Sequence, residues 1–322
     1  VRAVLATVAG LFARLGRVPA WFVHFPVQLL AVALGCSLGF AFLRRRRLAL
    51  LALALASYHA SRIMPWYWGR GVQPTPGDWV VVTSNVLRDN PLDALLLEVV
   101  ARESADLLVV QEAHPNWPKR LDCGLASAFP FRWTGHGLGV FSRHPVENLR
   151  LESVGVPERP VVCFDWCLPG HRVSVVGIHF HTPKAKSWDR RLREVEGAAR
   201  LLNTLPAPVV VLGDLNMSLW DPVYQDFMRG TGLVNTREGR GVVPTRTDKH
   251  LQELPELWRP LRWLASIPID HILHSPGWTV TDLRTGPGIG SDHLPLLARL
   301  RLGKEPGTAS GRNPRLVSLW DN

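Results

Sequence analysis

The sequence predicts an α+β fold in which two β-sheets pack face to face with helices outside, preceded by an N-terminal transmembrane helical segment. Three observations lead to this prediction. Residues 72–302 contain many short runs rich in β-branched residues and few with helical periodicity, a pattern typical of packed sheets. Residues 1–71 are apolar and contain no acidic residue. Polar side chains recur at the ends of predicted strands, where they need partners.

The N-terminal segment, residues 1–71, is expected to anchor the chain in a lipid bilayer. Residues 21–43 contain no charge, and about twenty apolar residues span a bilayer core. Residues 48–64 form a second stretch just long enough to span, and residues 3–13 form a third, shorter one. A cleaved signal peptide fits poorly because the apolar material is long and doubled. A buried helical hairpin of a soluble protein is the remaining alternative.

Four arginines, Arg44 to Arg47, form the turn between the two longer apolar stretches. Because loops rich in Lys and Arg tend to stay in the cytoplasm, we expect residues 72–322 on the extracytoplasmic side. Nine of the 37 basic residues lie in residues 1–71, which leaves 28 basic against 27 acidic residues in 72–322. The net charge of +10 therefore belongs to the anchor, and no large basic footprint for DNA is predicted.

Residues 72–302 are expected to form one domain of strands with two main helices. Helical periodicity marks residues 92–103 and 187–205, and Ser187 suits the N-cap position of the second helix. Apolar, β-branched runs predict strands at residues 79–87, 105–113, 137–146, 161–168, 172–181, 208–216, 269–275, 278–285 and 294–302. Residues 303–322 are rich in Gly, Pro and Ser and predict a mobile tail.

The four cysteines do not form a recognisable framework. No CxxC pair suggests zinc, and Cys163 and Cys167 share one face of a predicted strand. The interpretation as small, buried apolar residues is favoured, with a disulfide left open for an exported domain.

Polar residues lie at the ends of six predicted strands. Asp214 and Asn216 follow the apolar run Val209–Leu212, and residues two apart on a strand share a face, so both are expected to point outward together. The other placements are Asn85, Glu112, His179 with His181, Asp270, and Asp292 with His293. Carboxylates, amides and imidazoles without thiolates suit Mg²⁺ or Mn²⁺ better than zinc.

Six short motifs together resemble one enzyme superfamily. In order they are SNVL, VVQE, GIHFHTP, LGDLN, IDHIL and GSDHLP, and they lie within residues 79–302. The series is similar to that of the endonuclease/exonuclease/phosphatase superfamily, which has the deoxyribonuclease-I-like fold. The membrane-spanning N-terminus resembles a bacterial subgroup of unassigned activity. The resemblance implies a four-layer α/β sandwich of two packed mixed β-sheets and a phosphoester hydrolase that uses Mg²⁺ or Mn²⁺.

The resemblance also implies how metal and phosphate are held. Asn85 and Glu112 would bind the divalent ion, and Asp292 would complete the metal site. His179 would donate a hydrogen bond to the phosphate or to the leaving oxygen. Asn216 would hold a phosphate oxygen. Metal and imidazole together would stabilise the negative charge that develops during hydrolysis of a phosphodiester.

The same resemblance assigns the proton transfers. Asp214 would orient or deprotonate the attacking water, and His293, paired with Asp270, would act as general base or electrophilic imidazole. Which of Asp214 and His293 is the base stays open. Arg143 resembles the family's arginine after a strand serine and is expected to steady the site or contact phosphate. His181 is additional to the family pattern and is expected either to contact phosphate or to be solvated.

The choice of substrate is expected to depend on the loop at residues 242–268, where Trp and Leu alternate with Arg and Lys. Such a loop can stack on bases, contact lipid or pack on its own domain. Three functions therefore stay open: a membrane-tethered phosphodiesterase or nuclease acting on nucleic acid, a phospholipid or lipid-linked phosphate hydrolase, and an inactive family member that serves as a membrane scaffold. No protein partner is evident from the sequence.

Overall fold

The computed structural model describes residues 2–13, 20–69, 71–88, 90, 93–113, 128–184, 187–252 and 255–303. The N-terminal elements are α1 (Arg2–Leu11), η2 (Phe22–His24), α3 (Pro26–Phe42), α4 (Arg46–Ile63) and η3 (Met64–Tyr67). The later helices are α5 (Asp93–Glu103), α7 (Trp188–Thr204), α8 (Pro222–Thr231), α9 (Lys249–Gln252), η5 (Glu256–Trp258) and α10 (Arg259–Leu264). The strands are β1 (Trp79–Asn85), β2 (Leu107–Gln111), β3 (Phe131–Gly135), β4 (Leu138–Ser142), β5 (Val146–Glu152), β6 (Val161–Leu168), β7 (His171–His179), β8 (Val209–Asp214), β9 (Val234–Asn235), β10 (Asp270–His274), β11 (Trp278–Thr285) and β12 (Leu296–Leu302). The predicted tail lies outside the described residues except for Gly303.

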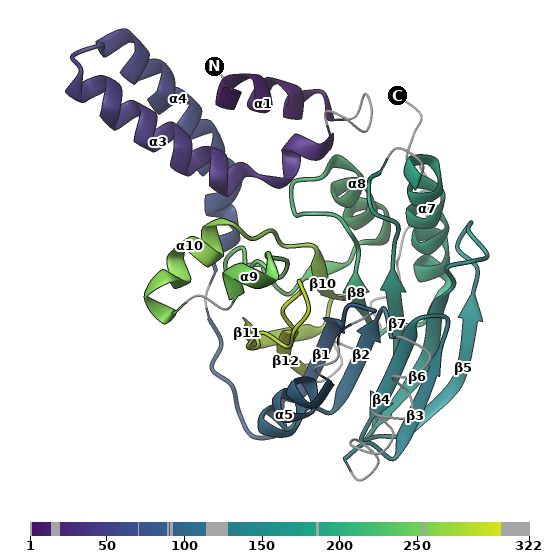
Figure 1. Ribbon diagram of the computed structural model, residues 1–322. Coiled ribbons are helices and arrows are strands. Elements are labelled where there is room, and N and C mark those ends of the chain that lie inside the picture. The colour runs from purple at the N-terminus through teal and green to yellow at the C-terminus, as the bar shows by residue number, and fades with distance from the viewer. Residues whose placement is uncertain are drawn as a thin grey trace.

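The strands form two mixed sheets that pack against each other (Figure 1). The first has the order β11-β12-β1-β2-β4-β3, and in it β1 runs parallel to β2 and antiparallel to β12. The second has the order β5-β6-β7-β8-β10-β9, and in it β7 runs parallel to β8 while β10 runs antiparallel to β8. The predicted α+β fold of two packed mixed sheets is therefore confirmed.

Continuous apolar runs form the central strands because these strands are covered on both faces. In β8, Val209 and Val211 join the buried cluster beneath α7 and α8, whereas Val210 and Leu212 join the cluster between the sheets. In β1, Val80 and Val82 face α5, and the intervening valine faces the second sheet. Successive side chains on a strand point to opposite faces. The three clusters therefore separate four layers: α5, the two sheets, and α7 with α8.

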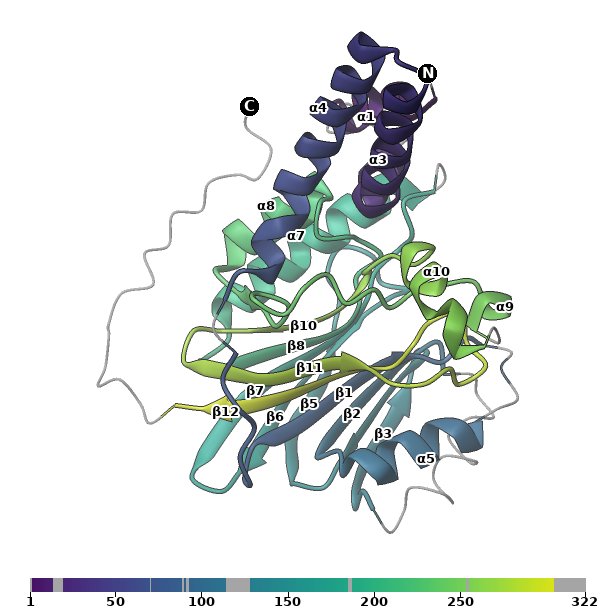
Figure 2. The same ribbon diagram turned by 90° about the vertical axis from the view of Figure 1, so that its left-hand side faces the viewer.

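Helices α3 and α4 form a hairpin that projects from the sandwich (Figures 1 and 2). Its outer surface is apolar: the side chains of Leu38 and Phe42 on α3 and Leu50 on α4 are exposed. Among the described residues, one helical stretch, Arg46–Tyr67, is long and apolar enough to cross a membrane, and Pro26–Phe42 is apolar but shorter. An exposed apolar surface of this kind is typical of a region that contacts protein or membrane in place of water.

The predicted span at residues 21–43 is not a single helix. Residues Phe22–His24 form a 3₁₀ turn, and α3 begins only at Pro26, whose fixed φ angle suits the first helical turn. Val23 and His24 are buried, and His24 Nδ1 lies 2.9 Å from Ser218 Oγ in the loop that follows β8. The start of the predicted span is therefore used to pack on the folded domain. The other two predicted spans correspond to helices. Residues 48–64 correspond to α4 and residues 3–13 to α1, and each end differs by no more than two residues.

Further contacts hold the base of the hairpin against the β-sandwich and its helices. Trp220 Nε1 donates to the Arg62 carbonyl oxygen at 3.0 Å, and Gln28 Nε2 donates to the Ser266 carbonyl oxygen at 3.1 Å. Val27 and Ile63 belong to the same buried cluster as residues of α7 and α8. The N-terminal segment is thus packed against the β-sandwich and its helices, and is not joined to them by the connecting chain alone.

The cysteines follow the sequence interpretation in part. Cys163 is a buried, free thiol on β6, and Cys167 is free and partly buried. Burial raises the pKa of the Cys163 thiol to about 12, which keeps it protonated and unreactive. Cys36 is instead exposed on the hairpin, and Cys123 lies outside the described residues.

We predict that Gly213→Ala destabilises the fold strongly. Gly213 has φ +151°, and a Cβ atom there would lie 1.9 Å from the Ile178 carbonyl oxygen of the neighbouring strand. Because backbone atoms cannot move aside cheaply, we expect a loss of about 3 kcal/mol in the free energy of unfolding. The loss should appear as a lower Tm in circular dichroism of the full chain in detergent.

Gly71→Ala is the matched control, since a Cβ atom at Gly71 meets nothing within 4 Å. Its Tm should stay near that of the wild type. A wild-type Tm for Gly213→Ala would contradict the close approach of β7 and β8 next to Asp214.

Candidate active site

The polar residues at the strand ends meet at one edge of the two sheets because of strand direction. β1 and β2 are parallel, so Asn85 at the end of β1 lies beside Gln111, directly before Glu112. β7 and β8 are also parallel, and His179 pairs with Asp214 at their common end. β10 starts where β8 stops, which places Asp270 opposite Asp214.

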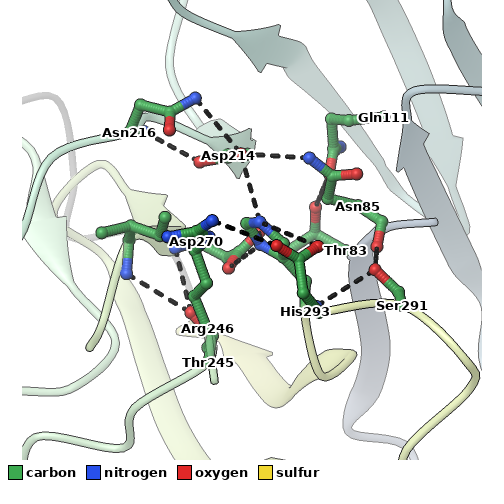
Figure 3. Close-up of polar contacts among 12 residues, drawn as sticks. Thr83, Asn85, Gln111, Asp214, Asn216, Thr245, Arg246, Asp270, Ser291 and His293 are labelled. Carbon is green, nitrogen blue, oxygen red and sulfur yellow. Dashed lines mark hydrogen bonds and ion pairs between the residues drawn. The ribbon is translucent and has the colours of Figure 1, made fainter. Parts of the chain in front are cut away.

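The Asn85 side chain joins the two sheets at the centre of the site (Figure 3). Its Nδ2 donates to Glu112 Oε1 at 3.0 Å and to Asp214 Oδ2 at 3.1 Å. Its Oδ1 accepts the Leu87 backbone N–H at 3.1 Å. The Asn85 amide therefore holds carboxylates from the first and the second sheet close together.

Asn216 lies at the site but not in the predicted way. β8 ends at Asp214, and Asn216 adopts a left-handed backbone with φ +52°, so the two residues do not share a strand face. The Asn216 N–H instead donates to Asp214 Oδ1 at 2.8 Å, as in turns closed by an Asp side chain. Asn216 Nδ2 donates to the Phe180 carbonyl oxygen at 2.9 Å. Asn216 thus holds the Asp214 carboxylate in position.

His293 and Asp270 form a buried pair (Figure 3). His293 Nδ1 lies 2.9 Å and 3.1 Å from the two Asp270 oxygens. His293 Nε2 points the other way, to within 3.9 Å of Asp214 Oδ2 and 4.0 Å of Asp292 Oδ1. The Thr245 hydroxyl accepts the Asp270 N–H at 3.1 Å and so fixes the carboxylate that orients the imidazole.

These buried charges shift one another's pKa. Burial acts to lower the pKa of His293, but the Asp270 and Asp214 carboxylates outweigh it and raise the pKa to about 9. Burial, together with the Asp270 charge, raises the pKa of Asp214 to about 7 despite the opposing effect of His293. At neutral pH the pair Asp270–His293 is therefore ionised, and Asp214 is poised to take up a proton.

His179 reaches the same centre from β7. Its Nε2 lies 3.7 Å from Glu112 Oε1 and 3.8 Å from Asp214 Oδ2. Burial lowers the pKa of His179 to about 3, helped by the positive charges of Arg159 and His293. A neutral His179 imidazole can donate one N–H to an oxygen that gains negative charge.

The donor set fits a hard divalent cation. Asn85 Nδ2 bridges the carboxylates of Glu112 and Asp214, and His293 Nε2 lies within 4.0 Å of carboxylate oxygens of both Asp214 and Asp292. Asp214, Asp270 and His293 place possible ligand atoms within 4.8 Å of one another. Oxygen donors of this kind suit Mg²⁺ or Mn²⁺, and concentrated negative charge attracts a cation. Because His293 is protonated at neutral pH and its Nδ1 is hydrogen-bonded to Asp270, the carboxylate oxygens are the donors available to a cation.

Arg143 does not belong to this site, so that prediction is wrong. β4 runs antiparallel to β2, so Leu138 pairs with Gln111 at the active-site edge, while Ser142 pairs with Leu107 at the far end. The Arg143 N–H donates to the Asp106 carbonyl oxygen at 2.9 Å, and Arg143 follows Leu138 by five residues, roughly 17 Å along the strand. The position of an arginine after a strand depends on the strand's direction.

His181 also differs from the expected arrangement. β7 ends at His179, so the strand-face argument does not extend to His181. His181 Nδ1 lies 2.7 Å from Oε1 of the buried Glu194 on α7, and the His181 N–H donates to Oε2 of the same residue at 2.9 Å. Glu194 of α7 therefore fixes the orientation of the His181 ring. We propose that the other ring nitrogen of His181 contacts phosphate.

An open cleft of about 690 Å³ adjoins the site on the side of Glu112 and His179, and its lining includes residues that the sequence did not identify. Its lining includes Arg88, Glu112, His136, Glu158, Arg159 and His179. Arg159 NH1 donates to the Phe180 carbonyl oxygen at 3.4 Å, which holds the guanidinium beside His179. Two charged residues between prolines, directly before β6, were the only sequence signal for this position.

His271 and Arg246 are further supporting residues. His271 Nε2 lies 2.7 Å from the Met217 carbonyl oxygen, in the loop that follows Asp214. Arg246 NH2 donates to Asp292 Oδ2 at 3.1 Å, so the Asp292 carboxylate is held at the rim of the site. Neither residue follows a strand end, which is why the search for polar strand ends missed both.

Known proteins share this arrangement of strands. An endonuclease/exonuclease/phosphatase from Beutenbergia cavernae DSM 12333 matches with a TM-score of 0.53 and 21% identity over 70% of this chain and 72% of that one. D. rerio TDP2 in complex with a single-strand DNA product matches with a TM-score of 0.54 and 17% identity over 70% and 99% of the chains. A functionally unknown conserved protein from Enterococcus faecalis V583 matches with a TM-score of 0.55 and 17% identity over 70% of this chain and 100% of that one. At these identities the likeness shows the fold alone.

No curated protein sequence matches the chain. The family model described as the Endonuclease/Exonuclease/phosphatase family matches residues 82–293, a range that begins within β1 and includes every strand-end residue of the site. The chain therefore belongs to the endonuclease/exonuclease/phosphatase family.

Proposed function

We propose that the chain is a membrane-tethered, divalent-metal-dependent phosphoester hydrolase that acts as a phosphodiesterase or nuclease. The family is described by endonuclease, exonuclease and phosphatase activities, and the similar D. rerio TDP2 is described with a single-strand DNA product. The observation that carries the proposal is the convergence of His179 and His293 on Asp214, with Nε2 atoms 3.8 Å and 3.9 Å from the same carboxylate oxygen. Two imidazoles around a carboxylate, with an oxygen donor set nearby, suit attack by water on a phosphate ester.

The pKa shifts favour a division of roles between the buried groups. Asp214, with its pKa raised to about 7, accepts the proton of the attacking water near neutral pH. The His293 imidazolium, held by Asp270, and the neutral His179 donate hydrogen bonds to oxygens that gain negative charge. A divalent ion held by Glu112, Asp292 and the Asn85 amide would supply further positive charge to the phosphate.

Nucleic acid is the first candidate substrate because the related D. rerio TDP2 is described with a single-strand DNA product. A phospholipid or lipid-linked phosphate is the second, and it is favoured by the exposed Leu and Trp side chains of η5 and α10. The third hypothesis, an inactive membrane scaffold, gains least support because each predicted catalytic residue lies at the site.

The proposed tether is the α3–α4 hairpin together with α1. Exposed apolar side chains on both helices support its insertion into a bilayer. The turn at Arg44–Arg47 lies at the tip of the hairpin, far from the sandwich (Figure 2). If this turn stays in the cytoplasm, the catalytic domain, residues 72–302, lies on the other side of the membrane.

We predict Mg²⁺- or Mn²⁺-dependent hydrolysis that Asp214→Asn lowers by about 10²-fold or more, since a proton acceptor is lost without a change of shape. The full chain in detergent micelles would be assayed on single-stranded DNA, duplex DNA and phospholipid vesicles, with EDTA as the metal-free reference. Asp165→Asn, a matched charge change on β6 beside Arg172, should keep wild-type rates.

The assay separates the three hypotheses. Metal-dependent cleavage of DNA supports the nuclease, and turnover of vesicles alone supports the lipid-phosphate hydrolase. Wild-type rates in Asp214→Asn would refute the proposed site. No turnover of any substrate by the wild type would favour the scaffold.

We further predict that His293 titrates near pH 9 in the metal-free protein and that Asp270→Asn lowers this pKa toward 6.5. Because the folded-state pKa is raised, the ion pair contributes stability fully below pH 6.5 and loses it as the pH rises through 9. Carbon-detected NMR of the imidazoles measures the pKa directly. An unchanged pKa in Asp270→Asn would show that other groups hold the charge on His293.

A further inference from the structure

With the exception of Leu151, exposed large apolar side chains lie in two parts of the described chain. Most lie on α1, α3, α4 and the residues up to Val72. In the described part of residues 73–303, only Leu151 and one short segment carry them. That segment consists of η5 and α10, Glu256–Leu264, and we call it the apolar lip.

The apolar lip is hydrophobic on both of its sides. Leu264 packs against the buried cluster beneath α7 and α8. Leu257 is 85% exposed, Trp258 is 50% exposed, and Leu261 and Trp263 are 45% and 38% exposed. A surface helix in water normally turns polar residues outward. An outward face of Trp and Leu next to arginines is typical of elements that lie in a membrane interface.

The apolar lip lies beside the base of the α3–α4 hairpin in both views (Figures 1 and 2). Gln28 Nε2 of α3 donates to the carbonyl oxygen of Ser266, two residues after α10. A bilayer that surrounds the hairpin would therefore reach the apolar lip at its surface. Arg262 lies on the same short helix, and basic side chains near a membrane surface favour anionic headgroups.

The same stretch of chain is linked to the active site through a series of hydrogen bonds. Arg262 NH1 donates to the Gln252 carbonyl oxygen at 3.1 Å, and Gln252 Nε2 donates to the Ser291 carbonyl oxygen at 2.8 Å. Ser291 in turn supports His293, whose N–H donates to Ser291 Oγ at 3.1 Å. A membrane surface that keeps the apolar lip in place would therefore, through these hydrogen bonds, also keep in place the segment that carries His293.

We propose that the apolar lip docks in the headgroup layer of the bilayer in which the hairpin is inserted, so that the active site acts on phosphoesters at the membrane surface. This inference rests on the membrane tether of the proposed function. It commits to lipid as the covering of Leu257, Trp258 and Leu261, in place of a second copy of the chain. It narrows the substrate class to lipid-linked phosphoesters or phosphoesters that gather at the bilayer.

Nitroxide labels test the docking without any assay of activity. The full chain would carry single cysteines in a background with its four native cysteines changed to alanine, in nanodiscs of phosphatidylcholine and phosphatidylglycerol. Trp258→Cys and Leu261→Cys report on the apolar lip, and Leu34→Cys reports on the hairpin. Leu151→Cys, an exposed apolar position on β5, is the matched control. The accessibility of each label to oxygen and to a water-soluble nickel chelate is measured by power saturation.

We expect the labels at Trp258 and Leu261 to favour oxygen over the nickel chelate, as the label at Leu34 does, while the label at Leu151 favours the chelate. Chelate-accessible labels on the apolar lip beside a lipid-exposed Leu34 label would overturn this inference alone. A chelate-accessible Leu34 label would overturn the tether itself. Spin–spin broadening at Trp258 that disappears on dilution with unlabelled chain would assign the surface to a second copy and refute lipid docking.

Discussion

The site depends on the burial of two carboxylates, Asp214 and Asp270, where the two sheets end. Each is about 1% exposed, and an uncompensated charge in such a place costs several kcal/mol. His293 lies between them, hydrogen-bonded to Asp270 and 3.9 Å from Asp214. Asn85 and Asn216 donate hydrogen bonds to Asp214, and the Asp270 N–H donates to Thr245. One imidazolium balances one of two buried negative charges. Burial, together with the charge of Asp270, raises the pKa of Asp214, and the negative charge that His293 leaves uncompensated makes the site suitable for a cation.

The same requirement shapes the backbone around the site. Leu87, Glu112 and Asn216 all adopt positive φ angles within two residues of a strand end, a conformation that costs about 1 kcal/mol for residues other than glycine. These sharp turns keep side chains over the edge of the sheets instead of continuing the strands. The loop that carries Asp214 and Asn216 is then fastened from outside, by His24 at Ser218 and by Arg62 at Trp220. The N-terminal segment and the catalytic loop therefore form one packed unit.

Sequence patterns predicted the parts of this protein that depend on local chemistry. The aliphatic run Val209–Leu212 predicted a strand covered on both faces, and the family motifs placed Asn85, Asp214 and His293 together. Features that depend on topology were missed or wrong. Arg143 lies at the far edge because β4 is antiparallel to β2, and the apolar stretch at residues 21–43 is divided because its first residues are buried against the catalytic domain. Arg159 enters the cleft from a turn whose direction no local pattern encodes.

Anomalous diffraction from crystals of the full chain soaked in Mn²⁺ would show whether strand ends from both sheets build a single divalent-cation site, because the anomalous signal locates the ion without any assumption about the substrate. We expect one strong peak bounded by the carboxylates of Glu112, Asp214 and Asp292, and its loss in crystals of Glu112→Gln. No peak at that position, or occupancy only at carboxylates elsewhere on the surface, would rule out a cation site at these strand ends.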